Sequence, residues 1–123
     1  MAQNINTTES SNTMKVYVIL DSHSEYCGFS VFGGVFRTKE EAIAEAKKRF
    51  EDSRYPTIEI RVVEETYRDR RNEKDITDIY VIPIRESDME NIERINEDLA
   101  DEYYGASVVA YNMGGLLITE RTI

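Results

Sequence analysis

The chain has 123 residues, the length of one domain whose core is large enough to fold without a metal or disulfides. Its 24 acidic residues outnumber its 15 basic residues and give a formal net charge of −9. Nucleic acids and anionic membranes are bound by cationic surfaces, so this charge argues against both as direct partners. The single cysteine, Cys27, excludes an intrachain disulfide and a multi-cysteine zinc site.

The first 13 residues are rich in Asn, Thr and Ser, and they contain no apolar run of the kind found in a secretory signal. We expect residues 1–13 to be a disordered tail and residues 14–123 to form a single α+β domain. No segment approaches the length of an apolar membrane span. Together with a lone cysteine that we expect to be reduced, these features predict a cytoplasmic protein.

Two strands and a helix are predicted in the first half of the chain. Lys15–Leu20 and Tyr26–Phe36 are rich in β-branched and aromatic residues, so we expect them to pair as a hairpin across the polar segment Asp21–Glu25. Thr38 is followed three residues later by Glu41, which is the pattern of a capping box. Apolar residues then recur at helical spacing, which predicts an amphipathic helix.

The second half predicts four strands around a second helix. The strands are expected over Thr57–Tyr67, Asp78–Ile84, Ala106–Tyr111 and Leu116–Thr119. Pro83 predicts that its strand ends at a sheet edge or a bulge. The helix opens with a capping box at Ser87 and is expected to run to the Tyr103–Tyr104 pair, with Gly105 as its C-cap.

The predicted order of elements is ββαββαββ. Two helices with one apolar stripe each predict an α+β, two-layer sandwich, in which both helices cover one face of a five- or six-stranded, mostly antiparallel sheet. The middle portion, β-α-β-β-α-β, has the ferredoxin-like order, so a ferredoxin-like core is one version of this fold. The first and last strands are expected to extend the sheet.

The only histidine, His23, lies in a polar segment that allows two chemical interpretations. If the segment is extended, Asp21, His23 and Glu25 point the same way, as metal ligands do. Alternatively, His23 lowers the pKa of Cys27 for nucleophilic attack. A solvated hairpin turn explains the same residues without any chemistry. Because no acid, base and nucleophile converge in the sequence, we expect no catalysis, no metal and no cofactor.

The second helix is unusually acidic. Between Glu86 and Glu102 there are eight acidic residues and one basic residue, Arg94. Five carboxylates form one stripe on an α-helical wheel: Glu86, Glu90, Glu93, Glu97 and Asp101. Successive carboxylates on such a stripe lie about 5–6 Å apart, comparable to the spacing of backbone phosphates. Asp101 and Glu102 lie at the end of the helix where its dipole disfavours acids, which makes their placement anomalous.

These features favour a non-enzymatic module that binds a basic protein partner, such as an inhibitor or nucleic-acid mimic of phage or bacterial accessory type. The predicted protein-binding residues are Glu86, Glu90, Glu93, Glu97, Asp101, Glu102 and Tyr104. A solvated acidic face that aids solubility explains the same charges without a partner. The alternative function is a small-molecule-binding or catalytic domain that uses the Asp21–Cys27 loop. A homodimer through a sheet edge is a further arrangement that the sequence allows.

Overall fold

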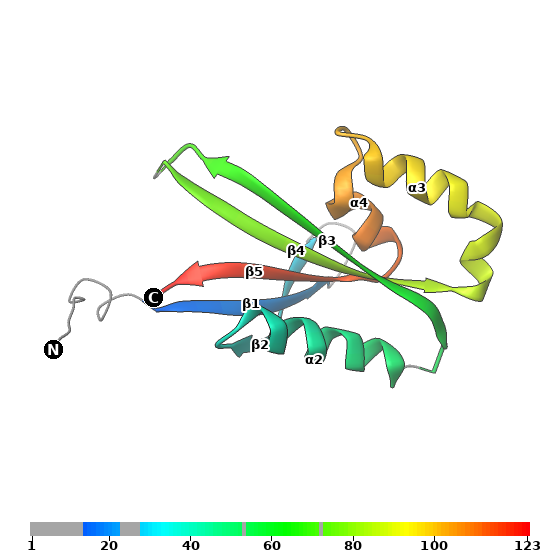
Figure 1. The fold of residues 1–123 in the computed structure, drawn as a ribbon, viewed down its shortest axis with the longest axis horizontal. Coiled ribbons are helices and arrows are strands. Elements are labelled where there is room, and N and C mark those ends of the chain that lie inside the picture. The colour runs from blue at the N-terminus through cyan, green and yellow to red at the C-terminus, as the bar shows by residue number, and fades with distance from the viewer. Residues whose placement is uncertain (1–13, 23–27, 53, 72) are drawn as a thin grey trace, which may run out of the picture.

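The computed structural model describes residues 14–22, 28–52, 54–71 and 73–123, so the tail predicted over residues 1–13 lies outside the described residues. Over the described ranges the fold is α+β, with a five-stranded antiparallel sheet, three α-helices and a short 3-10 helix (Figure 1). The strands are β1 (Lys15–Ser22), β2 (Phe29–Phe36), β3 (Thr57–Asp69), β4 (Lys74–Arg85) and β5 (Leu116–Thr122). The helices are α2 (Lys39–Glu51), the 3-10 helix η1 (Glu86–Asn91), α3 (Ile92–Ala100) and α4 (Gly105–Asn112).

The sheet has the strand order β2-β1-β5-β4-β3. The last strand, β5, pairs with β1 on one side and with β4 on the other, so it joins the β1–β2 hairpin to the β3–β4 hairpin. The expectation that the first and last strands extend the sheet was therefore wrong, because β2 and β3 form its edges. Consecutive apolar residues in β1 and β5 suit strands that are covered on both faces, and this explains their central position.

The helices lie on opposite faces of the sheet (Figure 1). Ile79 and Val81 of β4 pack in the cluster that contains α2, whereas Tyr80 and Ile82 pack in the cluster that contains α3 and α4. Successive residues of a strand point to opposite faces, so the two clusters are separated by the sheet. The predicted two-layer sandwich, with both helices on one face, was wrong, and a ferredoxin-like core is not formed.

Helix α2 begins where the capping box predicts. The Thr38 hydroxyl accepts a hydrogen bond from the Glu41 backbone N–H at 3.1 Å and donates one to the Glu41 carboxylate at 3.0 Å. Ala42, Ala46 and Phe50 are buried against the sheet. The apolar spacing of this segment therefore predicted both its secondary structure and its buried face.

The segment from Ser87 to Tyr111 differs from its prediction. It forms η1, α3 and α4, in place of one helix followed by a strand. Gly105 has a φ of +63°, as expected for a glycine that ends a helix, but it also begins α4. Ala106 and Ala110 are buried, and their small side chains let α4 pack closely on the sheet. No helix in the described ranges is long and apolar enough to span a membrane.

The connection from α4 to β5 is tight. The Gly115 N–H donates to the carbonyl of Ala110 at 2.6 Å. A Cβ atom on Gly115 would lie 2.7 Å from the Val81 carbonyl oxygen, so only glycine fits between α4 and β4. At Pro83, β4 pairs with β3 but no longer with β5, although the strand itself continues to Arg85.

Candidate functional site

The predicted binding residues lie on several short elements. Glu86 and Glu90 belong to η1, and Glu93 and Glu97 belong to α3. Because a 3-10 helix has three residues per turn, residues four apart in η1 do not align as they do in an α-helix. The prediction of one continuous five-residue carboxylate stripe was therefore wrong. Glu93 and Glu97 alone keep the α-helical spacing of four on which that prediction relied.

Six carboxylates on η1, on α3 and directly after α3 are nevertheless exposed, and we call them the acidic surface. Its members are Glu86, Glu90, Glu93, Glu97, Asp101 and Glu102. Within the part of the chain that the structure describes, none of the six forms an ion pair. Arg61 reaches α3 from β3 by a hydrogen bond to Asn96, but its Nε atom is paired with the Glu59 carboxylate at 2.6 Å. The acidic surface therefore has no ion-paired cation among the described residues.

Packing of α3 fixes the direction of the acidic surface. Ile95 is buried, and Ile92 and Leu99 pack against the same cluster, so this stripe faces the sheet. Glu93 and Glu97 lie on the remaining side of the helix and are exposed. The amphipathic spacing of α3 thus holds these carboxylates in solvent.

The anomalous position of Asp101 has a structural explanation that the sequence analysis missed. Its Oδ1 atom accepts a hydrogen bond from the Tyr103 N–H at 2.8 Å, and its backbone carbonyl accepts one from the Gly105 N–H at 2.7 Å. Asp101 therefore stabilises the turn between α3 and α4. An Asp side chain bonded two residues ahead is a common turn device, so the signal was present in the sequence.

A groove of about 360 Å³ lies between α3 and α4 beside the acidic surface. Its lining includes Asp88, Asn91, Arg94, Asp98, Tyr104 and Met113. Tyr104 also lines a neighbouring hollow of about 320 Å³ with Tyr103 and Val108. The structure therefore brings Tyr104, predicted as a binding residue, close to further acidic side chains and to a small apolar surface on α4.

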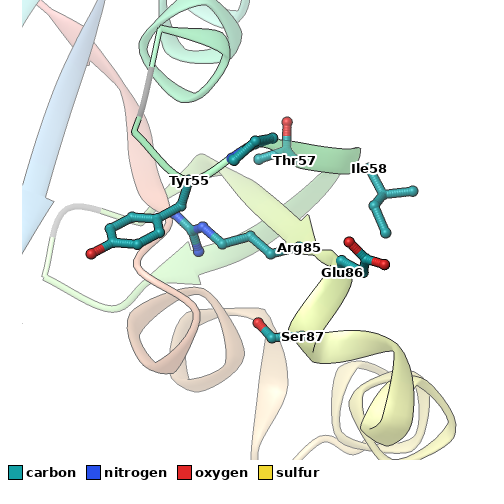
Figure 2. Close-up of a pocket in the computed structure, with 7 residues that line it drawn as sticks. Tyr55, Thr57, Ile58, Arg85, Glu86 and Ser87 are labelled. Carbon is teal, nitrogen blue, oxygen red and sulfur yellow. The ribbon is translucent and has the colours of Figure 1, made fainter.

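A second pocket, of about 480 Å³, lies where β3 begins and β4 ends (Figure 2). Its walls come from Tyr55 to Ile58 and from Arg85 to Ser87. The Arg85 side chain extends toward the Tyr55 ring (Figure 2) and donates to the Met113 carbonyl at 3.2 Å. Its buried Nε atom has no hydrogen-bond partner among the described residues. Sequence reasoning missed this pocket because its two walls are far apart in the chain.

Two buried residues, Asp78 and Tyr80, and the half-exposed Tyr67 form a polar cluster on the sheet face that α3 and α4 cover. The Tyr67 hydroxyl donates to Asp78 Oδ2 at 3.1 Å, while Asp78 Oδ1 is buried with no partner among the described residues. Burial, together with the nearby Asp78 carboxylate, raises the pKa of Tyr67. Burial also raises the pKa of Tyr80, and the Asp78 charge adds to the effect. Both phenols are therefore held in the neutral form, which suits hydrogen-bond donation.

The residues predicted for metal binding or nucleophilic chemistry cannot be compared with the structure. His23, Glu25 and Cys27 lie outside the described residues, as does most of the Asp21–Cys27 loop. Among the residues that are described, no group of three His, Cys, Asp or Glu side chains could hold a metal ion. The alternative function at this loop therefore stays a prediction.

Comparison with known proteins gives a family. A family model described as a domain of unknown function, DUF7336, matches residues 14–82, which is more than half of the chain. The match spans β1, β2, α2, β3 and most of β4, and it ends before the acidic surface, α4 and β5. No curated protein and no solved structure matches the chain. The chain belongs to the DUF7336 family.

Proposed function

We propose that this chain is a non-enzymatic, cytoplasmic module that binds a basic segment of a protein partner through its acidic surface. The supporting observation is the group of six exposed carboxylates that have no ion pairs among the described residues. Carboxylates four apart on a helix repel one another by a few tenths of a kcal/mol. A partner's Lys and Arg side chains would relieve this repulsion and would be attracted over about 10 Å at moderate salt.

The groove between α3 and α4 gives this partner a defined place to bind. Asp98 lines it together with Asp88 and Arg94. The Asp98 carboxylate and Asp88 Oδ1 can accept hydrogen bonds from an inserted ammonium or guanidinium group, while Asp88 Oδ2 accepts one from the Arg85 backbone. Tyr104, which is 45% exposed, adds an aromatic face on which a cation can rest. We infer that the partner inserts one basic side chain into the groove while its other basic residues lie along η1 and α3.

The inhibitor and nucleic-acid-mimic versions of this function are narrower forms of the same proposal. In those versions the partner is a nucleic-acid-binding protein, and the chain occupies the surface that would otherwise bind phosphates. Duplex DNA and this chain would then compete for the partner. A partner whose binding to the chain is unaffected by DNA would favour the general form over the mimic.

The proposal is tested with a fluorescent Lys- and Arg-rich peptide and the triple variant Glu93→Lys, Glu97→Lys, Glu102→Lys, which leaves the turn contact of Asp101 in place. We expect the variant to bind at least about tenfold more weakly, with most of the loss in the association rate, because long-range attraction is removed. Binding to the unmodified chain should weaken steeply as salt is raised. Circular dichroism checks that the variant keeps its fold.

The matched control is Glu51→Lys, Asp52→Lys, Glu73→Lys, which changes the net charge by the same amount. These three residues are exposed and have no ion pair in the described ranges. Glu51 and Asp52 end α2, on the opposite face of the sheet, and Glu73 lies in the β3–β4 turn. Equal losses in both triple variants would show that net charge acts globally, and this would refute a binding site on the acidic surface.

A further inference from the structure

The two edge strands of the sheet differ sharply in charge. Edge strand β3 carries six charged residues: Glu59, Arg61, Glu64, Glu65, Arg68 and Asp69. Edge strand β2, Phe29–Phe36, carries none, although the whole chain has a net charge of −9. Charged side chains protect an edge strand from pairing with another strand. By this criterion β3 is protected and β2 is open to pairing.

Strand β2 also exposes large apolar side chains. The exposed fractions of Val31, Phe32 and Val35 are 40%, 66% and 51%. Scattered single apolar residues on a surface need no explanation, but three lie on this one edge strand, with Phe32 and Val35 on one face and Val31 on the other. Main-chain groups on the outer side of such an edge are available to a further strand.

The face on which these side chains lie is set by the pairing of β2 with β1. Phe32 pairs with Leu20, and Val35 pairs with Val18. Leu20 pairs in turn with Leu117 of β5, which packs in the cluster beneath α3 and α4. Cross-strand partners share a face, so Phe32 and Val35 project on the face that α4 partly covers.

That same face carries an apolar hollow at the other end of β2. The hollow has a volume of about 260 Å³ and is lined by Gly28, Phe29, Ser107, Val108 and Tyr111. The Phe29 ring is packed against the Tyr80 and Tyr111 rings, with ring centroids 6.0 Å and 6.3 Å apart. One end of β2 thus offers protruding apolar side chains, and the other end offers an apolar recess.

We propose that two copies of this chain associate through β2, antiparallel and about a two-fold axis perpendicular to the sheet. Antiparallel pairing places the Val35 end of one strand beside the Phe29 end of the other, so the protruding side chains of each copy reach the recess of its partner. The two five-stranded sheets become one continuous sheet. This dimer is separate from the acidic surface and does not depend on the function proposed above.

Charge identifies the second copy as the occupant of this edge. A basic partner would find no carboxylate on β2, whereas two copies bring an uncharged strand against an uncharged strand. The edge is not perfectly regular, because a register shift lies opposite Gly33–Gly34 and Arg49 donates to the Gly33 carbonyl. Bulges bend an edge strand, so we expect the pairing to use the segments on either side of these glycines.

The test is the molar mass of the full chain in solution, measured by light scattering over a range of concentrations, with the variant Phe32→Lys, Val35→Lys. We expect the unmodified chain to approach twice the mass of 14.2 kDa as concentration rises, and the variant to remain at that mass. Both side chains are exposed, so circular dichroism should show an unchanged fold. Amide exchange in β2 of the unmodified chain should slow with increasing concentration.

The matched control is Ile58→Lys, Val62→Lys on the other edge strand, where the exposed fractions are 58% and 38%. This control should still dimerise. An unmodified chain that stays monomeric at its highest soluble concentration overturns the proposal. A dimer that survives in the β2 variant, or that is lost equally in both variants, also overturns it. If the β2 variant fails to fold, concentration-dependent exchange protection in β2 of the unmodified chain decides the question.

Discussion

The two faces of the sheet are covered in different ways. On one face a single capped helix, α2, covers a cluster made almost entirely of aliphatic and aromatic side chains. On the other face α3 and α4 together cover the second cluster, and this face also holds the buried Asp78 carboxylate, the α3–α4 groove and the acidic surface. The contrast teaches that the α2 face mainly stabilises the fold, whereas the other face carries the polar features available for function. The following predictions test that division, from the largest effect to the smallest.

The largest loss should follow from truncating the core on the α2 face. Ile79 is completely buried in that cluster, and Ile79→Ala should lower the free energy of unfolding by about 2–5 kcal/mol, because it removes apolar contacts and leaves a cavity. Ile95→Ala, on α3, should cost about 2 kcal/mol, at the low end of that range, because the short α3 can shift to fill the space. Urea denaturation of both variants measures the difference. If the Ile95 variant is the less stable of the two, the conclusion that the α2 face mainly stabilises the fold is contradicted.

The next largest effect concerns the buried carboxylate. Tyr67→Phe removes the hydrogen bond that Asp78 Oδ2 accepts, so the buried carboxylate loses its side-chain donor. We expect a loss of about 1–3 kcal/mol, the usual cost of an unsatisfied buried polar group. In the double variant Tyr67→Phe, Asp78→Leu most of that loss should be recovered, because no carboxylate is left without a donor. Thermal unfolding of the single and double variants gives the comparison.

A smaller difference in stability is expected between variants at the N-termini of α2 and α3. Thr38→Ala deletes the side-chain cap of α2 and should cost about 0.5–2 kcal/mol. Asn91 stands at the corresponding position of α3 and makes no cap hydrogen bond, so Asn91→Ala should change stability by less than about 0.5 kcal/mol. Equal losses in the two variants, measured by denaturant unfolding, would show that the helices begin in the same way.

The last prediction concerns the melting temperature at alkaline pH, and it expects no change at neutral pH. Burial raises the pKa of Tyr80 above its ordinary value of 10.0, and burial with the Asp78 charge does the same for Tyr67. A raised pKa means that the folded state holds its protons more tightly than the unfolded state. The stabilisation is complete below pH 10 and is lost as pH rises through the folded-state values. The melting temperature should therefore fall above about pH 10, and Tyr80→Phe should reduce the fall.

The elements that could be predicted are those whose sequence signals lie within a single segment of the chain. The cap at Thr38 and the apolar spacing that follows it lie within one segment, and they located α2 correctly. Ala106–Tyr111 was predicted as a strand, because a short apolar run is the same in a buried strand and a buried helix. As α4 this segment is buried against the sheet, and its connection to β5 brings Gly115 close to the Val81 carbonyl of β4, which is a tertiary contact.

The sequence predicted that the acidic residues of the candidate site are exposed, but it did not predict how they are arranged. The acidic residues are exposed as expected, because exposure follows from the apolar spacing of Ile92, Ile95 and Leu99. Their predicted alignment was wrong, since no sequence signal shows that the first six residues, Glu86–Asn91, adopt 3-10 geometry. The α3–α4 groove could not be predicted at all while α4 was assigned as a strand.

The central position of β5 has a consequence for synthesis. Of the five strands β5 is the last to leave the ribosome, yet it forms the contact between the two hairpins. Until Leu116–Thr122 has emerged, the inner edges of β1 and β4 are unpaired and apolar, which is the state most prone to misassembly. The family-matched segment, residues 14–82, also lacks β5. Expressed alone it should yield two hairpins with no strand pairing between them, so nascent chains of this protein should need protection until β5 is made.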